Sequence, residues 1–373
     1  MHPATIPRPD NVPSSGARPA RVTAAMVAAR AGVSAATVSL VTSGKTAGRV
    51  SAENIAKVNH AINELGYVVD GLGSSLARGR SNIVILVAPD VSNPFFAKVI
   101  DGVRTEIGDA FQLLLSVTEA GQMPTPAVVR NLLSLRPAGL LVDAPSAGFL
   151  AGLPATGPMV LLDTAGVESE APSVNFDLDG AALMLADHLA DLGHSTVAYL
   201  DGTTGTETFR VRREAFCRHA RTRGINVVAQ TATTIDVGAA ADAFARAWPQ
   251  WQRQGVTAVV CSTDTHAYGV LQEARVARLA VPAQLAVTGF DDLPYSETSS
   301  PGLTTVRLPA AELGRAAGRQ LLRLLAGEEL AAKELVGEEL EGDDRNGHRV
   351  TLESTLVVRG STVDGGVAQG GQV

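Results

Sequence analysis

Five aspartates stand at or just after the ends of short apolar runs, where their carboxylates could share one ligand. They are Asp90, Asp143, Asp163, Asp264 and Asp291. The runs before them are rich in Val, Ile and Leu, and parallel strands bring their carboxyl ends to one edge of a sheet. Because a carboxylate accepts pairs of hydroxyl protons, this set suits a polyol or a sugar. For Asp90 and Asp163 capping of a following helix is an equal alternative.

Two neighbouring phenylalanines, Phe95 and Phe96, could stack on the apolar face of such a sugar. We expect one of the two to lie in the core instead. The sequence therefore predicts a carbohydrate-like ligand held by acidic and aromatic side chains.

The residue patterns for catalysis, metals and cofactors are missing. The sequence contains no Walker A motif, no G-x-S-x-G, no H-E-x-x-H and no nucleophile–base pair. His188, His194 and His266 do not have metal-ligand spacing and are predicted to be surface or helix-end residues. The GLGSSLAR segment at 71–78 matches a dinucleotide fingerprint only in part, because Leu76 replaces the third glycine. We predict no enzyme activity, no metal and no cofactor.

The elements that must position these side chains alternate between strand-like and helix-like patterns, which predicts βαβ units and two doubly wound parallel lobes. The predicted strands are Ile83–Ala88, Phe111–Val117, Gly139–Asp143, Met159–Asp163, Thr196–Leu200, Ile225–Ala229, Ala258–Cys261 and Leu285–Gly289. The predicted helices are Phe95–Ile107, Ala181–Leu192, Phe209–Arg221 and His266–Arg275. An acidic, solvated excursion at Gly327–His348 precedes a last strand pattern at Val350–Arg359.

The first 80 residues differ in charge and pattern. They hold nine Lys and Arg against four acids, a net charge of +5, whereas the whole chain carries −7. Residues 22–41 predict two short helices capped by Thr23 and Ser34 and separated by a turn at Gly32. A third helix begins at Ser51 and repeats apolar side chains at helical spacing, at Ile55, Val58, Ile62 and Leu65. The pattern favours a basic helix-turn-helix over a generic helical hairpin.

The ends of the chain and its cysteines limit the class of protein. Cys217 and Cys261 provide no disulfide framework, which indicates a reducing cytoplasm. No apolar run reaches the ~18 residues that a membrane span needs. The proline-rich residues 1–20 predict a disordered leader rather than a secretory signal, and the glycine-rich residues 363–373 predict a disordered tail.

Four segments occur in a specific order: AGVSAATVSLV in the predicted helix-turn-helix, then DHLADLGHSTVAYLDG, TAVVCSTDTHAYGVLQEA and LAVTGFDDLPYSETSSPGLTTVR. In order and spacing they resemble the lactose/galactose repressor (LacI/GalR) family over residues 22–362. The resemblance implies an all-α helix-turn-helix DNA-binding domain at 21–67, a hinge at 68–81 and an α/β effector domain at 82–362. That domain is expected to be two-lobed, like periplasmic sugar-binding proteins, and to dimerise.

The resemblance also places residues on DNA. The start of the second helix, with Ala35, Ala36 and Leu40, corresponds to the part that enters the major groove. The family usually has a polar residue at position 36 and Arg at position 40, so the guanine-reading contact is lost here. Contacts to thymine methyl groups and DNA shape are expected to take its place, unless Thr37, Ser39 or the loop 43–48 reads the bases.

Polar and basic residues around that helix are predicted to position the domain on the duplex without specifying sequence. They are Thr23, Ser34, Thr37, Ser39, Thr42, Lys45 and Arg49. In the hinge, Leu76 corresponds to a residue that wedges into the minor groove, with packing inside the protein as its alternative. Gly71 and Gly73 each weaken the hinge helix by about 0.8–1 kcal/mol, so we expect it to order only on DNA.

In the effector domain the resemblance adds Arg212, which corresponds to a position that binds sugar hydroxyls. It also shows departures. Thr263-Asp264 replaces the family's usual Asn-Asp, and Leu308 stands where a polar residue is common. For Arg212 and Asp291 we favour ligand contact over a structural role.

The sequence therefore predicts a transcriptional regulator that binds a palindromic DNA operator as a homodimer and senses a small molecule, with a sugar as the expected effector. Repression is the usual sense in the family. The alternatives are a DNA-binding regulator without a small-molecule effector and a solute-binding protein, which the DNA-binding head and the missing signal argue against.

Overall fold

The computed structural model describes residues 22–67, 81–88, 91, 93–117, 123–153, 157–167, 169–203, 206–330 and 349–363. Within the range 206–330, side chains are described up to residue 327. The predicted leader, most of the hinge with Leu76, Asp90 and the predicted tail beyond 363 lie outside these residues. Contacts divide the chain into two compact units, Met1–Ala77 and Arg78–Val373.

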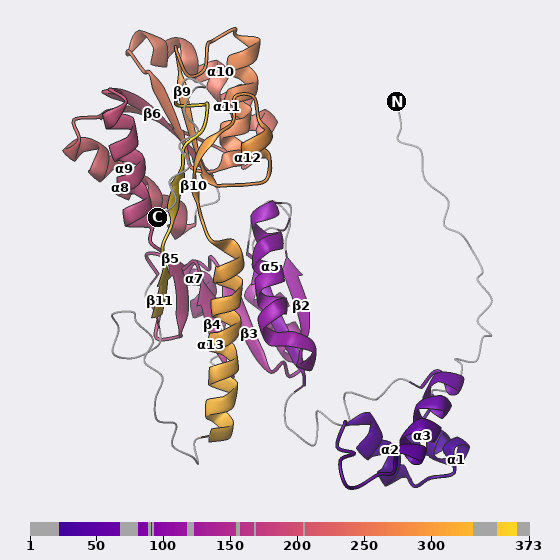
Figure 1. The fold of residues 1–373 in the computed structure, drawn as a ribbon. Helices are drawn as coiled ribbons and strands as arrows, with labels where there is room; N and C mark the ends of the chain where they lie inside the picture. The colour runs from indigo at the N-terminus through magenta and orange to yellow at the C-terminus, as the bar shows by residue number, and fades with distance from the viewer. Residues whose placement is uncertain are drawn as a thin grey trace, which may run out of the picture. The chain divides into compact units, whose positions relative to one another are not determined.

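The first unit contains three helices, α1 (Ala24–Ala31), α2 (Ala35–Thr42) and α3 (Ala52–Leu65) (Figure 1). The hydroxyls of Thr23, Ser34 and Ser51 accept a backbone N–H at the start of each helix, as predicted. Gly32 ends α1 with φ 67°, a left-handed conformation that glycine adopts without steric cost. The three predicted helix starts and the predicted turn are confirmed.

A small core holds these helices together. Val27, Val38 and Val58, one from each helix, are fully buried or nearly so. Ala28 and Ala61 close the remaining space. Of the apolar positions predicted on α3, Ile62 and Leu65 pack only at the margin of this core, and Ala61, which the spacing did not single out, lies inside it.

The angle between α1 and α2 is typical of a helix-turn-helix. The two helices bend by 106°, within the range of roughly 90–120° for such motifs. Among the described residues, no single helix is long and apolar enough to cross a membrane; α1 and α2 meet that test only when joined across their bend. An ion pair between Arg30 and Glu64 at 2.7 Å links α1 to α3.

The second unit is built on two six-stranded sheets, with the strand orders β11-β5-β4-β3-β1-β2 and β12-β10-β9-β8-β6-β7 (Figure 1). Paired strands are parallel except β10 and β12. The strands are β1 (Ile83–Ala88), β2 (Gln112–Val117), β3 (Gly139–Asp143), β4 (Met159–Leu162), β5 (Ser173–Phe176), β6 (Thr196–Gly202), β7 (Asn226–Thr233), β8 (Ala258–Cys261), β9 (Ala286–Asp291), β10 (Thr304–Arg307), β11 (Arg349–Leu352) and β12 (Thr355–Val357). The predicted doubly wound α/β fold is confirmed.

Helices connect and cover these strands. They are α5 (Pro94–Ile107), α6 (Pro126–Leu133), α7 (Ala147–Ala151), α8 (Leu178–Asp191), α9 (Glu207–Thr222), α10 (Val237–Arg253), α11 (Asp264–Val276), α12 (Tyr295–Thr298) and α13 (Ala310–Leu330), with a 3₁₀ turn at Gly108–Ala110. The sequence patterns did not predict the two short strands β5 and β10. Each has only four residues and carries polar side chains, so its apolar signal is weak.

The end of the chain departs from its predicted pattern in two places. Val350–Arg359 is not one strand: β11 pairs with β5 in the first lobe and β12 pairs with β10 in the second. The chain passes between the lobes at residues 353–354, so one continuous strand is impossible there. The predicted excursion at Gly327–His348 begins inside α13, which continues to Leu330, and residues 331–348 lie outside the described part.

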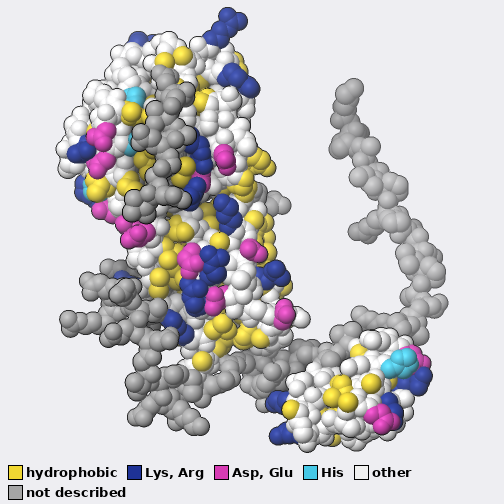
Figure 2. Space-filling view, in the orientation of Figure 1, with side chains coloured by type: hydrophobic (Ala, Val, Ile, Leu, Met, Phe, Trp, Pro, Cys, Tyr) yellow, Lys and Arg dark blue, Asp and Glu magenta, His cyan; other side chains and the backbone are white. Residues whose placement is uncertain are grey.

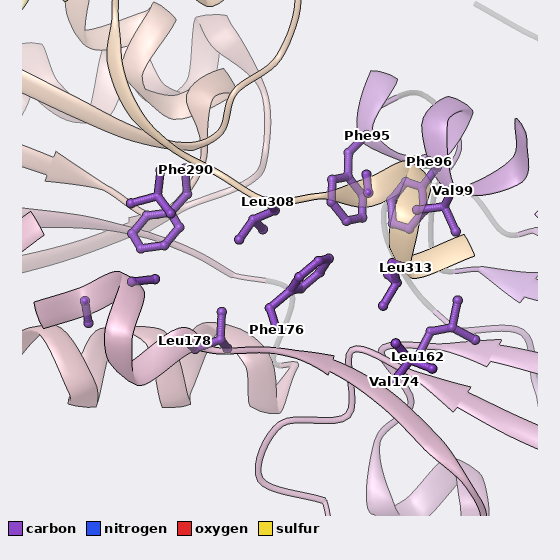
Figure 3. Close-up of a cluster of buried hydrophobic side chains, with 14 of the residues drawn as sticks. Phe95, Phe96, Val99, Leu162, Val174, Phe176, Leu178, Phe290, Leu308 and Leu313 are labelled. Carbon is purple, nitrogen blue, oxygen red and sulfur yellow. The ribbon is translucent and has the colours of Figure 1, made fainter. Parts of the chain in front are cut away.

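The two lobes share one apolar core. Leu308, on the segment that leaves β10, lies between Phe290 of the second lobe and Phe176 of the first (Figure 3). Phe95 meets the ring of Phe176 edge-on at 6.0 Å between centroids. Phe95 and Phe96 are both buried in this cluster, so the prediction that only one of them belongs to the core is wrong.

Close packing between α5 and α13 holds the first lobe against the returning chain. A Cβ atom built on Gly314 would overlap the backbone of Val99, and one built on Gly102 would overlap the backbone of Ala311. Glycine at these positions lets the two helix backbones approach more closely than any side chain would allow.

We expect Gly314→Ala to lower the free energy of unfolding by about 1–3 kcal/mol, because the new methyl group forces α5 and α13 apart. Urea unfolding followed by circular dichroism measures this change. The matched control is Gly148→Ala in α7, where a Cβ would meet nothing within 4 Å. That change should be neutral or stabilising by up to ~1 kcal/mol. Equal effects of the two substitutions would contradict the tight helix contact.

Candidate functional site

Four charged side chains from both lobes form the candidate ligand site. Asp143 ends β3 and Asp163 follows β4 in the first lobe, while Arg212 lies on α9 and Asp291 ends β9 in the second. Thr208, one turn before Arg212, donates a hydrogen bond of 3.1 Å to the carbonyl of Asp163 and so joins the lobes beside them. The predicted meeting of strand-end aspartates is thus observed for three of the five.

All four side chains are buried, with 2–8% of each residue exposed. Within the described parts of the chain, one polar atom of each lacks a hydrogen-bond partner. These atoms are Oδ1 of Asp143, Oδ1 of Asp163, Nε of Arg212 and Oδ2 of Asp291. Since buried polar groups in proteins are nearly always paired, these four atoms are candidates for contact with a ligand.

The backbone at this site is strained. Asp163 has φ 48° and Asp291 has φ 113°. Ala144, directly after Asp143, has φ 42°. Residues other than glycine rarely adopt such angles, which cost of order 1–3 kcal/mol each and cluster at binding sites. For Asp163 the structure also removes the helix-capping alternative, because the next element is the strand β5.

Contacts from the second lobe fix the position of Arg212. Its Nη1 donates a 2.5 Å hydrogen bond to the carbonyl of Ser262, and its guanidinium lies 4.4 Å from the ring centre of Phe290. The same Nη1 is 3.9 Å from Oδ1 of Asp291, a long ion pair. Arg212 is therefore held in place by the protein while its Nε remains available.

Burial dominates the electrostatics of the three carboxyl groups. It raises the pKa of Asp143 well above the usual value, and the charge of Asp163 adds to the shift. It also raises the pKa values of Asp163 and Asp291, against the attraction of Arg212. Each carboxylate is thus costly to keep charged, as is common at binding sites.

Asp264, another predicted ligand residue, makes its hydrogen bonds within the second lobe. Its Oδ2 accepts hydrogen bonds from the backbone of Leu293 at 2.8 Å and the hydroxyl of Ser296 at 2.5 Å. Its Oδ1 accepts from Thr305 at 2.5 Å. Burial raises the pKa of Asp264 to about 7 against these three donors. The carboxylate joins α11 to β10 and to the turn after β9.

Thr263 likewise makes a hydrogen bond within the second lobe. It caps α11 by accepting the backbone N–H of His266 at 3.2 Å. The ring of His266 also contacts the hydroxyl of Thr263 at 3.1 Å and the carbonyl of Thr234. His266 is at a helix end, as predicted, but it is fully buried rather than on the surface. Phe95 and Phe96 pack in the shared core and Asp90 is not described, so the stacking role has no support in the geometry.

The sequence analysis missed Asn93. Its side chain caps α5 by accepting the N–H of Phe95 at 2.9 Å, and its hydrogen bond to Asp291 opposes the rise of that carboxyl's pKa. Asn93 therefore connects the first lobe to the site from the second. The segment NPFF contained the signal, because an asparagine before proline is a typical helix cap. The prediction for this segment considered only the two phenylalanines.

On the three-helix unit, Ala35 and Ala36 are exposed at the start of α2, and Leu40 is half-buried one turn later. The hydroxyls of Ser34 and Thr37 lie 2.9 Å apart and bond each other. Thr42 donates to the carbonyls of its own helix, so its hydroxyl is already engaged. Ser39, Lys45, Arg49 and Thr23 are exposed. The visible face of this unit carries apolar side chains in its middle, and Lys or Arg, Asp or Glu and a His toward its margins (Figure 2).

No group of three or more His, Cys, Asp or Glu side chains able to hold a metal ion occurs among the residues that the structure describes.

Comparison with known proteins assigns both units. Residues 23–70 match the model of bacterial regulatory proteins of the lacI family, and residues 186–362 match the periplasmic binding protein-like domain. The regulator MalR of Streptomyces coelicolor is 33% identical over 322 residues, which cover 81% of this chain and 89% of MalR. The chain belongs to the LacI family.

Other members support this assignment over most of the length. The repressor CytR of Escherichia coli K12 is 27% identical over 344 residues, 90% of this chain and 95% of CytR. The Lac repressor bound to ONPG has a TM-score of 0.74 and 25% identity, covering 92% of this chain and all of that one. A complex of the regulator CelR with cellobiose has a TM-score of 0.62 and 25% identity, with 91% and 100% covered. These relatives are transcriptional regulators, not enzymes, so this LacI-family chain is a DNA-binding transcriptional regulator with a sugar-binding-like domain.

The buried carboxyl of Asp143 gives a testable pH dependence. The pKa of Asp143 is higher in the folded than in the unfolded protein. Its contribution to the free energy of unfolding is therefore fully present below pH ~4 and is lost as the pH rises through the raised pKa. Asparagine has no proton to lose. We therefore expect Asp143→Asn to match the wild type near pH ~4 and to be more stable by about 1–3 kcal/mol at pH ~8.

Urea unfolding of both proteins across this pH range measures the difference. Asp242→Asn on α10 is the control, because Asp242 is exposed and its substitution should change stability little at any pH. A wild type more stable than Asp143→Asn at the high pH would show that the folded protein does not disfavour the charged carboxylate.

Proposed function

We propose that this LacI-family regulator represses transcription by binding a palindromic operator as a homodimer, and that a small polyhydroxylated molecule controls it. The observation that carries the effector proposal is the group of four buried polar atoms on Asp143, Asp163, Arg212 and Asp291, which have no hydrogen-bond partner among the described residues. Carboxylate oxygens accept hydroxyl protons and the arginine Nε donates, so the set matches the mixed donors and acceptors of a sugar.

The effector would act by joining the lobes. Asp143 and Asp163 belong to the first lobe, and Arg212 and Asp291 to the second, so a ligand bonded to all four stabilises one arrangement of the lobes over others. The repressor CytR and the CelR–cellobiose complex support repression and a carbohydrate effector. The effector's differential affinity for the two arrangements then sets how strongly it shifts DNA binding.

Dimerisation is supported by an unpaired sheet edge. β2 is the last strand of its sheet and exposes Leu114, Leu115 and Val117 by 37–42%. Apolar edge strands are rarely left uncovered in solution. Two copies of the three-helix unit would then place two α2 helices in successive major grooves of a two-fold operator, in the reducing cytoplasm where transcription regulators work.

The proposed DNA contacts come from α2 and its margins. Ala35 and Ala36, exposed at the helix start, and Leu40 offer methyl groups but no hydrogen-bond donors to the bases. Lys45 and Arg49, exposed beyond the helix, would hold phosphates. We propose operators read through thymine methyl groups and DNA shape, with Leu76 in the hinge as the minor-groove wedge.

Selection of sheared genomic DNA on the purified protein, followed by sequencing, tests the operator. We expect a two-fold site rich in A·T at the positions facing α2. Leu40→Arg should move the preferred base to guanine, with about 1–3 kcal/mol of new discrimination. Leu40→Met, which stays apolar, is the control and should select the wild-type site. Smooth enrichment without any site would mean that binding is limited to phosphates.

Ligand-induced thermal stabilisation tests the effector site. A panel of hexoses, pentoses and disaccharides should contain at least one compound that raises the melting temperature and changes affinity for the selected operator. Arg212→Lys should weaken binding of that compound by roughly 10–150-fold, because the single nitrogen of lysine cannot occupy both the Nη1 position bonded to Ser262 and the Nε position.

Arg210→Lys is the matched control for this substitution. Arg210 lies on the same helix but is exposed and pairs with Glu207 and Glu214. It should bind the compound as the wild type does. Specific operator binding that no compound of the panel changes would favour the alternative of a regulator without a small-molecule effector.

A further inference from the structure

His266 is a fully buried polar side chain in the first turn of α11, next to the segments that follow β7 and β8. Burial lowers the pKa of its imidazole, so the ring is neutral at physiological pH. A neutral histidine can hold two groups at once, because one ring nitrogen donates a proton and the other accepts one. The partners of the two nitrogens therefore show what the buried ring does.

Both ring nitrogens have partners. Nε2 lies 3.1 Å from the carbonyl of Thr234, which follows β7. A carbonyl oxygen can only accept, so Nε2 carries the proton and donates it there. Nδ1 is then an acceptor, and it lies 3.2 Å from the hydroxyl of Ser262 and 3.1 Å from that of Thr263. These contacts select one tautomer, with the proton on Nε2.

The acceptor side of the ring fixes the two residues that follow β8. Ser262 is fully buried and Thr263 nearly so. The imidazole Nδ1 is within reach of both hydroxyls, and the backbone N–H of His266 donates to the Thr263 hydroxyl at 3.2 Å. A buried hydroxyl that loses its acceptor pays the full cost of its lost hydration. The conformation of this two-residue segment therefore depends on Nδ1.

The same segment holds Arg212. Its Nη1 donates to the Ser262 carbonyl at 2.5 Å, whereas Oδ1 of Asp291 is 3.9 Å away. The ring centre of Phe290 lies 4.4 Å from the guanidinium, but a cation–π contact fixes no hydrogen-bond direction. The Ser262 carbonyl therefore sets the orientation of the guanidinium, including the Nε that has no partner among the described residues.

The charged groups near the imidazole are already paired, so they do not compete for its nitrogens. Asp201 favours a charged imidazole, but its carboxylate forms an ion pair with Arg213. Asp264, on the same helix as His266, accepts hydrogen bonds from three donors in other segments. The donor and the acceptor of the ring thus both stay with the groups described above.

We propose that His266 is a positioning residue for the effector. Its Nδ1 holds the Ser262–Thr263 segment, the Ser262 carbonyl holds Arg212, and Arg212 directs its Nε to the ligand. The inference rests on the proposed function, because it takes Arg212 to contact the effector. His266 itself touches no ligand and acts only through this series of hydrogen bonds.

Two substitutions separate the two sides of the ring. In His266→Asn the amide Oδ1 takes the place of Nδ1, so the acceptor for Ser262 and Thr263 is kept and the bond to Thr234 is lost. In His266→Gln the amide nitrogen takes the place of the ring Nε2, so the Thr234 bond is kept and the acceptor is lost. Each variant loses one side of the ring, and urea unfolding shows that both are folded.

The first readout is nuclear magnetic resonance without any ligand. In protein that carries a nitrogen isotope label in histidine and arginine, the ring nitrogens report the tautomer directly. The Arg212 Nε–H signal is the one that disappears in Arg212→Lys. We expect the proton on Nε2 in the wild type. His266→Asn should leave the Arg212 signal in place, and His266→Gln should shift or broaden it.

His194→Asn is the matched control. Nδ1 of His194 also contacts a hydroxyl, that of Thr257 at 2.8 Å, but Thr257 precedes β8 and so lies at the opposite edge of the sheet from Ser262. The control makes the same chemical change at a distance from Arg212. It should leave the Arg212 signal unchanged.

The second readout is calorimetric affinity for glucose, galactose, ribose and cellobiose. For each sugar that the wild type binds, His266→Asn should stay within about threefold of the wild-type Kd, and His266→Gln should bind about tenfold more weakly. Adding His266→Gln to Arg212→Lys should cause almost no further loss of affinity, because the two residues act through the same contact.

The outcomes distinguish this inference from the proposed effector. A proton on Nδ1, or equal effects of His266→Asn and His266→Gln on the Arg212 signal, would overturn the positioning role. Losses of affinity from His266→Gln and Arg212→Lys that add in full would overturn it as well. Binding of none of the four sugars counts against the proposed effector, while the Arg212 signal still confirms or overturns the connection from His266 to Arg212.

Discussion

Loss of hydration at the junction of the two lobes is the constraint on which the effector domain depends. Asp143, Asp163 and Asp291 are buried there with one arginine, and each keeps an oxygen without a partner in the described structure. Folding alone would not favour such an arrangement, because buried charges are costly unless they are paired. Hydrogen bonds from the rest of the domain hold these groups in place, such as those of Thr208 to Asp163 and of Arg212 to Ser262.

That scaffold works through parallel strands and the segments that join the lobes. The ends of β3, β4 and β9 point their aspartates to one region, and positive φ angles at Asp163 and Asp291 direct the side chains. Leu308 fills the apolar space between Phe290 and Phe176. Asp264 anchors the neighbouring turn through Leu293, Ser296 and Thr305. Apolar packing therefore supplies the stability that the charged site takes away.

The three-helix DNA-binding unit has a small core and hydroxyl-capped helices. Its core rests on three valines and two alanines, and capping hydroxyls satisfy each helix start. At the start of α2, Ala35 and Ala36 are exposed, and the hydroxyls of Ser34 and Thr37 bond each other. The mode of operator reading proposed above, through methyl contacts and DNA shape, follows from these apolar side chains.

The local chemistry of the sequence determined much of this protein. Capping residues and a turn glycine located all three helices of the head, and apolar runs located β1, β3 and β8 at their observed bounds. Their position at predicted strand ends identified Asp143, Asp163 and Asp291 as candidate site residues, because the carboxyl ends of parallel strands lie at one edge of the sheet. The family itself could be recognised because its motifs keep their order along the chain.

Only the tertiary structure decided which polar groups remain for a ligand. Asp264 and Thr263 look equivalent to the other strand-end residues in sequence, yet their hydrogen bonds go to Ser296, Thr305 and His266. The division of residues 350–359 between two sheets also depends on partners far away in the chain. Hydrogen-bond partners and burial come from distant segments, so a local pattern can nominate a functional side chain but cannot show whether the fold has already used it.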